Sequence, residues 1–374
     1  MTSEQKQPKA RVLAYYLPQF HPIPENDEWW GKGFTEWTNV GKAKPLFPGH
    51  YQPHVPADLG YYDLRVPETR KAQADMAREY GVEGFVYWHY WFGNGKRLLE
   101  RPFNEVLTSG EPDFPFALAW ANETWSGFYH GLRDEKKVLI EQIYPGEDDY
   151  IAHFNTILPA FKDKRYITCE GKPIFIIYHI NQLPNPKAFI DLWNKLAVEN
   201  GLKGIYFIAH EQDLTDEEKL KSRYSEVKKY GADAINVVNK YVNSVSELPL
   251  LYRIARKLLY KNPKFRLIPN ITPYCVNNYA TIYDEKEDFF PSVVPNWDHT
   301  PRTGIDGSVI VGSTPDKFYE VCKNAINKVI HKSRDKRFLF IKSWNEWAEG
   351  NYMEPDLKYG RGYLEALRKA LFDE

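Results

Sequence analysis

The chain has 374 residues, 43% of them hydrophobic and 26% charged, so it can bury a sizeable core and is not a disordered protein. Its 49 Lys and Arg residues against 50 Asp and Glu residues give a net charge of −1. This balance excludes the strong positive field of a nucleic-acid-binding protein, and no nucleic acid partner is expected.

One order of elements recurs along the chain: a helix, a glycine and then an apolar strand. Apolar residues at helical spacing, proline in the first turn and glycine after the last turn mark the helices. Helices are expected over residues 67–80, 187–199, about 217–230 and about 314–331.

Eight apolar runs are predicted to be strands, over residues 12–17, 84–90, 116–120, 173–179, 204–209, 234–238, 292–296 and 338–344. Most of the runs are continuous and not alternating, as in parallel strands that are buried on both faces. With crossover helices between them they predict an α/β fold, a single (β/α)8 TIM barrel. A doubly wound open sheet is the alternative, but no GxGxxG follows the first strand.

A single domain is expected over residues 1–374, with residues 1–10 as a disordered tail. The segment 18–63 is too long for an ordinary strand-to-helix turn and holds Trp29, Trp30, Trp37 and many prolines. It is predicted to be a capping insertion after the first strand, folded over the barrel top, with little helix of its own.

The polar residues that follow the predicted strands are carboxylates, amides, imidazoles and tryptophans, and in a barrel they meet at one rim. Acids among aromatic rings suit a sugar, whose C–H faces stack on indoles while its hydroxyls need polar partners. Some of the tryptophans are expected to be ordinary packing. The candidate substrate-binding residues are Tyr16, Trp88, His89, Trp120, Asn122, Glu123, Trp125, His210, Trp297, Asn345 and Trp347.

Glu346 and Glu349 stand three residues apart where the eighth strand ends. Cleavage of a glycosidic bond needs one group to protonate the leaving oxygen and another to attack or stabilise the anomeric centre. Two carboxylates meet that need, and the flanking Trp344 and Trp347 could raise one of the two pKa values by desolvation. An isolated ExxE is more often a solvated helix turn or a capping pair, but this pair follows FLFIKSW, an apolar strand whose one charged residue is Lys342.

Glu123 after the third strand has two interpretations: an acid in the site, or a salt-bridge partner of Arg133. Histidines also fall near strand ends, at His21, His89, His179 and His210. No HExxH or HxH occurs, so hydrogen bonding to sugar hydroxyls or a structural role is favoured over a metal site. No metal and no cofactor are expected.

Cys169, Cys275 and Cys322 are far apart and odd in number, which favours reduced thiols over a disulfide framework. The N-terminus MTSEQKQPKA lacks an apolar signal region, and the longest apolar runs cannot span a bilayer. As written the chain is expected to be cytoplasmic, or periplasmic if a leader has been removed.

Four segments carry a family resemblance: YYLPQFHPIPENDEWWGKGFTEWTNV (15–40), FVYWHYWFGNGKRLLERP (85–102), LAWANETW (118–125) and KSWNEWAEGNYMEPD (342–356). They resemble the WbsX-type family, from about residue 11 to 367. That family is similar to the glycoside hydrolase family 99 endo-α-mannosidases and endomannanases. Its members sit in bacterial polysaccharide gene clusters and were often labelled glycosyltransferases from that context.

The resemblance implies a (β/α)8 barrel that acts on an α-linked glycan without a metal. The E-W-x-E-G element of family 99 matches residues 346–350. By that match Glu349 is the general acid/base, and Glu346 deprotonates the sugar 2-hydroxyl, which attacks C1 to give a 1,2-anhydro sugar with overall retention. Family 99 usually has His where this chain has Ala348, so the leaving-group subsite and the substrate do not carry over.

Three functions follow as hypotheses. The first is a retaining glycoside hydrolase, endo-acting, on an oligosaccharide or polysaccharide with α-mannoside-like linkages. The second is a glycosyltransferase of polysaccharide assembly, although Asp148 and Asp149 suit a helix start better than a DxD metal site. The third is a non-catalytic carbohydrate-binding barrel, which would leave the paired acids idle.

Overall fold

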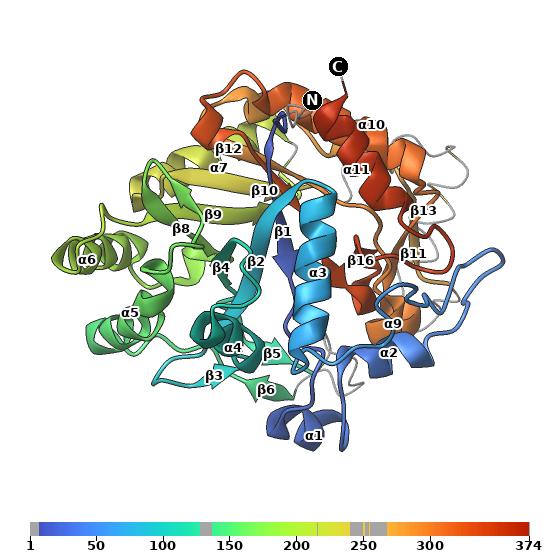
Figure 1. Ribbon diagram of the computed structural model, residues 1–374, viewed down its shortest axis with the longest axis horizontal. Coiled ribbons are helices and arrows are strands. Elements are labelled where there is room, and N and C mark those ends of the chain that lie inside the picture. Colours follow the sequence, from blue (N-terminus) through green and yellow to red (C-terminus); the bar gives the residue numbers. More distant parts are fainter. Residues whose placement is uncertain are drawn as a thin grey trace, which may run out of the picture.

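The structure, a computed structural model, describes residues 7–127, 137–214, 216–239 and 268–373, together with residues 250 and 254. Within these residues eight parallel strands form the barrel (Figure 1). They are β1 (Arg11–Tyr16), β2 (Val82–Trp91), β4 (Phe116–Trp120), β8 (Lys172–Ile177), β9 (Tyr206–Gln212), β10 (Ala234–Val238), β12 (Phe289–Val293) and β14 (Phe338–Ile341).

The barrel is closed because β1 pairs in parallel with both β2 and β14. Ala14 is opposite Phe85 on one side and Ile341 on the other. This closure confirms the predicted (β/α)8 TIM barrel and excludes the open sheet.

Helices and short strands surround the barrel. The helices are α1 (Pro24–Trp30), α2 (Glu36–Lys42), α3 (Pro67–Glu79), α4 (Arg101–Ser109), α5 (Glu147–Phe161), α6 (Pro186–Glu199), α7 (Glu217–Tyr230), α9 (Thr300–Thr303), α10 (Pro315–Val329) and α11 (Gly362–Phe372). The short strands are β3 (Arg97–Leu98), β5 (Trp125–Ser126), β6 (Val138–Ile140), β7 (Thr168–Cys169), β11 (Asn270–Pro273), β13 (Ser308–Val311), β15 (Asn345–Glu346) and β16 (Asn351–Tyr352). Every helix in the described ranges is too short or too polar to cross a bilayer.

The helix ends follow local sequence signals. The side chain of Asn185 accepts from the backbone N–H of Ala188 at the start of α6, and Asp216 does the same for α7. Gly231 ends α7 in the left-handed conformation, with φ at 94°, where a side chain would be strained. These signals explain why the predicted bounds of the two helices agree with the structure to within a residue.

Some elements differ from the sequence prediction. The seventh barrel strand is Phe289–Val293 and not 292–296. The fully buried Phe289 and Phe290 belong to the sheet, although Pro291 follows them in the sequence. Helices α4 and α11 had no predicted counterpart. Segment 18–63 also contains two short helices, α1 and α2, where little helix was expected.

Segment 18–63 lies along the chain that follows β14. The backbone N–H of Ala57 donates to the carbonyl of Pro355, and that of Leu357 donates to the carbonyl of Val55. Helix α2 packs against both α9 and the 3-10 turn Trp347–Glu349. This segment therefore supports the region that carries the predicted acid pair.

The chain ends lie together at the opposite end of the barrel, away from α1, α2 and the β5–β6 hairpin (Figure 1). Residues 1–6 lie outside the described residues. The backbone N–H of Lys9 donates to the carbonyl of Leu371, and Ala10 is buried. Both facts tie the start of β1 to the end of α11.

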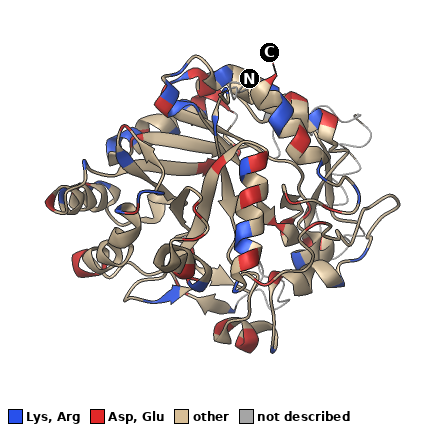
Figure 2. Cartoon of the chain, viewed as in Figure 1, with Lys and Arg blue, Asp and Glu red and all other residues tan. Residues whose placement is uncertain are grey.

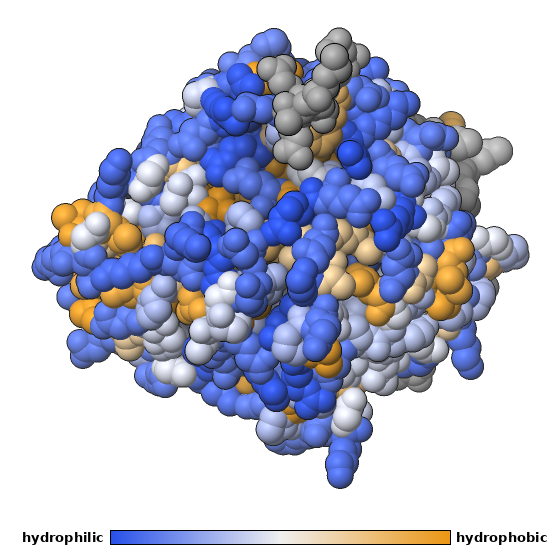
Figure 3. Space-filling view, in the orientation of Figure 1, coloured by the Kyte–Doolittle hydropathy of each residue, from blue (hydrophilic) through white to orange (hydrophobic). Residues whose placement is uncertain are grey.

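Charged side chains line the outer helices, while the strands are almost without them (Figure 2). Hydrophobic residues appear on the surface as small separate patches in one view of the molecule (Figure 3). Inside, aromatic rings fill the space between strands and helices. Trp193 of α6 is fully buried and contacts the rings of Phe175, Phe189 and Phe207.

Trp193→Ala should lower the free energy of unfolding by about 3–5 kcal/mol, because a large aromatic side chain leaves a cavity between α6 and the barrel. Denaturant unfolding followed by fluorescence or circular dichroism measures it. Val198→Ala is the matched control in the same helix, since Val198 is 62% exposed, and should change stability by no more than about 0.5 kcal/mol. Equal effects of the two variants would contradict this packing.

Candidate active site

A cavity of about 790 Å³ opens at the ends of the barrel strands. Its volume falls in the range of about 300–1,000 Å³ that is usual for small-molecule sites. The predicted site residues that line it are Trp88, Glu123, Trp125, His210, Trp297, Glu346 and Glu349. Both acids of the predicted pair therefore face one space.

The other predicted contacts lie beside the cavity and not on its wall. Asn345 exchanges two hydrogen bonds with the backbone of Leu17, at 2.7 and 3.0 Å. Asn122 makes two bonds of the same kind with the backbone of His179, at 2.8 and 2.9 Å. Both amides fix the loops that present the lining residues.

Four aromatic candidates also pack behind the wall. Trp120 donates to a backbone carbonyl, that of Trp91, and Tyr16 donates to Gln73. His89 lies 2.8 Å from His153 between their Nε2 atoms, and burial lowers the pKa of both rings well below the usual value. Trp347 is 1% exposed. These four side chains serve the packing of the barrel top.

The lining tryptophans are themselves largely buried. Trp88 is 7% exposed, Trp125 3% and Trp297 5%. Trp88 stacks on Tyr15 with 4.8 Å between ring centroids. Only a small part of each indole is therefore exposed to the cavity.

Glu346 is held by the residues that end β14. Lys342 Nζ forms an ion pair with its Oε2, and Ser343 Oγ donates to the same oxygen at 2.6 Å. The Lys342 and Glu346 side chains are each 7% exposed. The two charged groups therefore form a buried ion pair at the wall of the cavity.

Glu349 is held by a different cation. Arg302 of α9 forms an ion pair with its Oε1, and His299 Nε2 lies 3.8 Å from that oxygen. Asn351 donates to the other oxygen, Oε2, at 3.2 Å. The Glu349 side chain is 13% exposed, so it reaches the cavity while most of it is buried.

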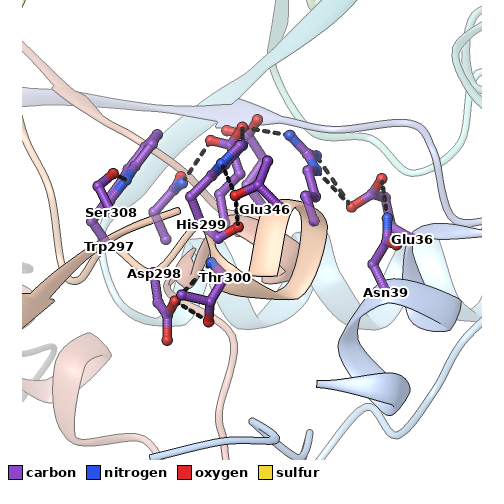
Figure 4. Close-up of polar contacts among 12 residues, drawn as sticks. Glu36, Asn39, Trp297, Asp298, His299, Thr300, Ser308 and Glu346 are labelled. Carbon is purple, nitrogen blue, oxygen red and sulfur yellow. Dashed lines mark hydrogen bonds and ion pairs between the residues drawn. The ribbon is translucent and has the colours of Figure 1, made fainter. Parts of the chain in front are cut away.

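Arg302 also binds Glu36, a residue of α2 that was not predicted from the sequence to belong to the site. The two are 3.1 Å apart between Nη2 and Oε2, and the carboxylate of Glu36 points toward the group around Glu346 and His299 (Figure 4). Burial raises the pKa of Glu36, Arg302 opposes this rise, and Glu349 and Glu346 add to it. Burial alone would lower the pKa of Arg302, but the three glutamates raise it above its usual value.

We call Glu36, Glu346, Glu349, Arg302 and Lys342 the acid cluster. It places three carboxylates against two cations in a mostly buried space. In this cluster, burial and the neighbouring carboxylates of Glu349 and Glu346 favour a proton on Glu36.

Glu123 lies beside a histidine in the wall of the cavity. Its Oε2 lies 3.5 Å from Nε2 of His179, and both side chains line the cavity. Arg133 lies outside the described residues. Within the described ranges, no group of three or more His, Cys, Asp or Glu side chains is placed to hold a metal ion.

Comparison with known proteins gives the family. A family model described as Glycosyltransferase WbsX matches residues 12–367. The chain belongs to this family. An uncharacterized protein WxcX from Xanthomonas campestris pv. campestris strain B100 is 35% identical over 373 residues, which cover 97% of this chain and 50% of that protein. The chain thus spans about half the length of the curated relatives it matches.

Solved structures share the barrel of this WbsX-family chain. A glycoside hydrolase-like protein matches with a TM-score of 0.60 and 15% identity, covering 99% of this chain and 96% of the other. A GH99 endo-α-mannosidase from Bacteroides thetaiotaomicron matches with a TM-score of 0.51 and 17% identity, covering 96% and 95%. At these identities the likeness shows a common fold, a glycoside hydrolase-like barrel.

Glu354 is a second residue that was not predicted from the sequence to belong to the site. It is 2% exposed and accepts hydrogen bonds from Trp347 Nε1 at 2.6 Å, Gln73 Nε2 at 2.6 Å and Tyr62 Oη at 2.9 Å. Burial raises its pKa to about 7, although these donors lower it. Glu354 therefore fixes Trp347, which lies between the two cavity acids in sequence, and stays partly protonated near neutral pH.

Glu354→Gln should alter how stability depends on pH. The unfolded chain releases this proton near pH 4.5, but the folded protein keeps it until about pH 7. As pH rises through that window, the wild-type free energy of unfolding should fall by about 3 kcal/mol relative to the variant. Urea unfolding at several pH values measures it. Parallel pH profiles for wild type and Glu354→Gln would contradict a raised pKa of the buried Glu354 carboxyl. The control is Glu365→Gln on the exposed face of α11, which should keep the wild-type profile.

Proposed function

We propose that the protein is a retaining, endo-acting glycoside hydrolase that cleaves an α-linked, α-mannoside-like glycan. One observation carries this proposal: Glu346 and Glu349 line one cavity at the end of a glycoside hydrolase-like barrel, together with the largely buried Trp88, Trp125 and Trp297. The shared fold with an endo-α-mannosidase supports the substrate class.

Glu349 serves as general acid and base, and Glu346 as the base of the first step. Glu346 takes the proton of the sugar 2-hydroxyl, whose oxygen attacks C1 while the bond from C1 to the leaving oxygen breaks. Glu349 gives its proton to that leaving oxygen. Water, deprotonated by Glu349, then opens the 1,2-anhydro sugar at C1, and Glu346 returns the proton to O2.

The acid cluster fits this sequence of proton transfers. Glu349 must begin protonated and Glu346 must begin charged. Lys342 and Ser343 both stabilise charged Glu346, whereas Glu349 competes with Glu36 for Arg302. The proposal requires that the proton, which burial and the neighbouring carboxylates favour on Glu36, is held by Glu349 when the substrate is bound. On a sugar without a suitable 2-hydroxyl, Glu346 would act as a direct nucleophile.

A glycosyltransferase is the second candidate, and the description of the family favours it. The cations at the cavity argue against a nucleotide-sugar donor. Arg302, Lys342 and Arg223 each form an ion pair with a carboxylate, so a diphosphate would meet negative charge beside every one of them. A non-catalytic sugar-binding barrel is the third candidate, and it would not explain why the acid cluster lies at the cavity.

Incubation with a panel of α-linked oligosaccharides should release new reducing ends. Glu346→Gln and Glu349→Gln should each lower turnover by at least about 10²–10⁴-fold, the usual contribution of a general acid or base. Glu365→Gln, an exposed acid on α11, should leave turnover unchanged. If wild type and Glu349→Gln are equally inert on every glycan that binds, the hydrolase proposal is wrong.

Thermal unfolding separates the first two candidates. A bound ligand raises Tm according to its concentration relative to Kd. Free α-linked oligosaccharides should raise the Tm of the Glu349→Gln variant, whereas nucleotide sugars should leave it unchanged. Stabilisation by a nucleotide sugar but by no free glycan would select the transferase.

A further inference from the structure

The cavity is lined by residues from opposite sides of the barrel mouth. Around the closed sheet, β8 lies four strands from β14 in either direction, so the two strands are opposite each other. Side chains at the ends of β8 and β9 line the same cavity as Glu346. A ligand that occupies the acid pair and extends over the mouth therefore meets this opposite side.

We call the cavity-lining residues Tyr178, Glu211, Gln212 and Arg223 the β8–β9 wall. Arg223 Nη2 lies 2.7 Å and its Nε lies 2.8 Å from the same oxygen of Glu211. Gln212 Nε2 donates to the phenol oxygen of Tyr178 at 2.5 Å. All four side chains are thus fixed before a ligand arrives.

The wall offers donors and acceptors side by side. Arg223 has five N–H groups, and its contacts with Glu211 and Glu226 use three of them. Tyr178 accepts from Gln212 and keeps its own hydrogen as a donor. A sugar hydroxyl both donates and accepts, so it can bond to a carboxylate oxygen and a guanidinium N–H at once.

The charge of the wall selects a neutral ligand. Arg223 is paired with Glu211, and the ring of nearby His179 lies 3.5 Å from Glu123, so both basic side chains face a carboxylate. Burial raises the pKa of Glu211, while Arg223 lowers it. An added anionic group would be repelled by both acids, whereas hydroxyls gain charge-assisted hydrogen bonds.

We propose that the β8–β9 wall is a second sugar subsite, which binds a residue of a neutral oligosaccharide away from the bond that is cleaved. This inference rests on the proposed function, because the acid pair marks where that bond lies. It makes Glu211 and Arg223 specificity-determining residues. The substrate then spans the mouth and contains more than one sugar.

The test measures binding in the Glu349→Gln background, where no hydrolysis occurs. The probes are α-linked mannotrioses, which reach both sides, and methyl α-mannoside, which fills one subsite. Calorimetry should show that adding Glu211→Gln weakens mannotriose binding by about 10- to 100-fold, the effect of losing a hydrogen bond to a charged group. The affinity for methyl α-mannoside should stay unchanged.

Glu226→Gln is the matched control. Glu226 also pairs with Arg223, at 2.5 Å, but does not line the cavity. It should leave mannotriose affinity unchanged, because Arg223 keeps both bonds to Glu211. Equal losses in the two variants would mean that α7 was merely loosened, and the subsite would be rejected. The same holds if Glu211→Gln has no effect or if no mannotriose binds.

Failure of the subsite and failure of the proposed function give different results. If mannotrioses bind through Glu211 but the wild-type protein never cleaves them, the hydrolase proposal fails and the subsite stands. If the wild-type protein cleaves them and Glu211→Gln does so with unchanged KM and kcat, the subsite fails and the hydrolase proposal stands.

Discussion

The shared guanidinium of Arg302 is the interaction on which the site depends. It binds Glu36 from the segment after β1 and Glu349 from the chain after β14, two residues that lie far apart in sequence. An unpaired charge in such a buried place costs several kcal/mol. Helix α2, helix α9 and the turn after β14 must therefore be in place together for both glutamates to be paired.

A second set of contacts fixes what surrounds the acids. In the segment after β14, Lys342 and Ser343 hold Glu346, Asn345 locks to Leu17, and Glu354 holds Trp347. Of these side chains, Asn345 and Trp347 were predicted from the sequence to bind substrate. Most of these contacts in the motif 342–356 hold Glu346 and its neighbours in place. Contact with a ligand explains only part of the motif.

The sequence predicted the barrel well because its signal is local. Eight apolar runs and the glycines between them mark strands and helix ends without any knowledge of the rest of the chain. The same logic located the site, since residues after parallel strands meet at one rim. It could not tell which of them face the cavity: Trp88 lines it and its neighbour His89 packs behind it. Nor could it find Glu36 and Arg302, which are 266 residues apart and meet only in the folded barrel.

The position of the two chain ends has a further consequence. Lys9 and Leu371 are joined by a backbone hydrogen bond at the floor of the barrel, and the cavity opens at the other end. The curated relatives are about twice as long as the matched region. A module joined before Lys9 or after Leu371 would therefore start at the face opposite the mouth of the cavity.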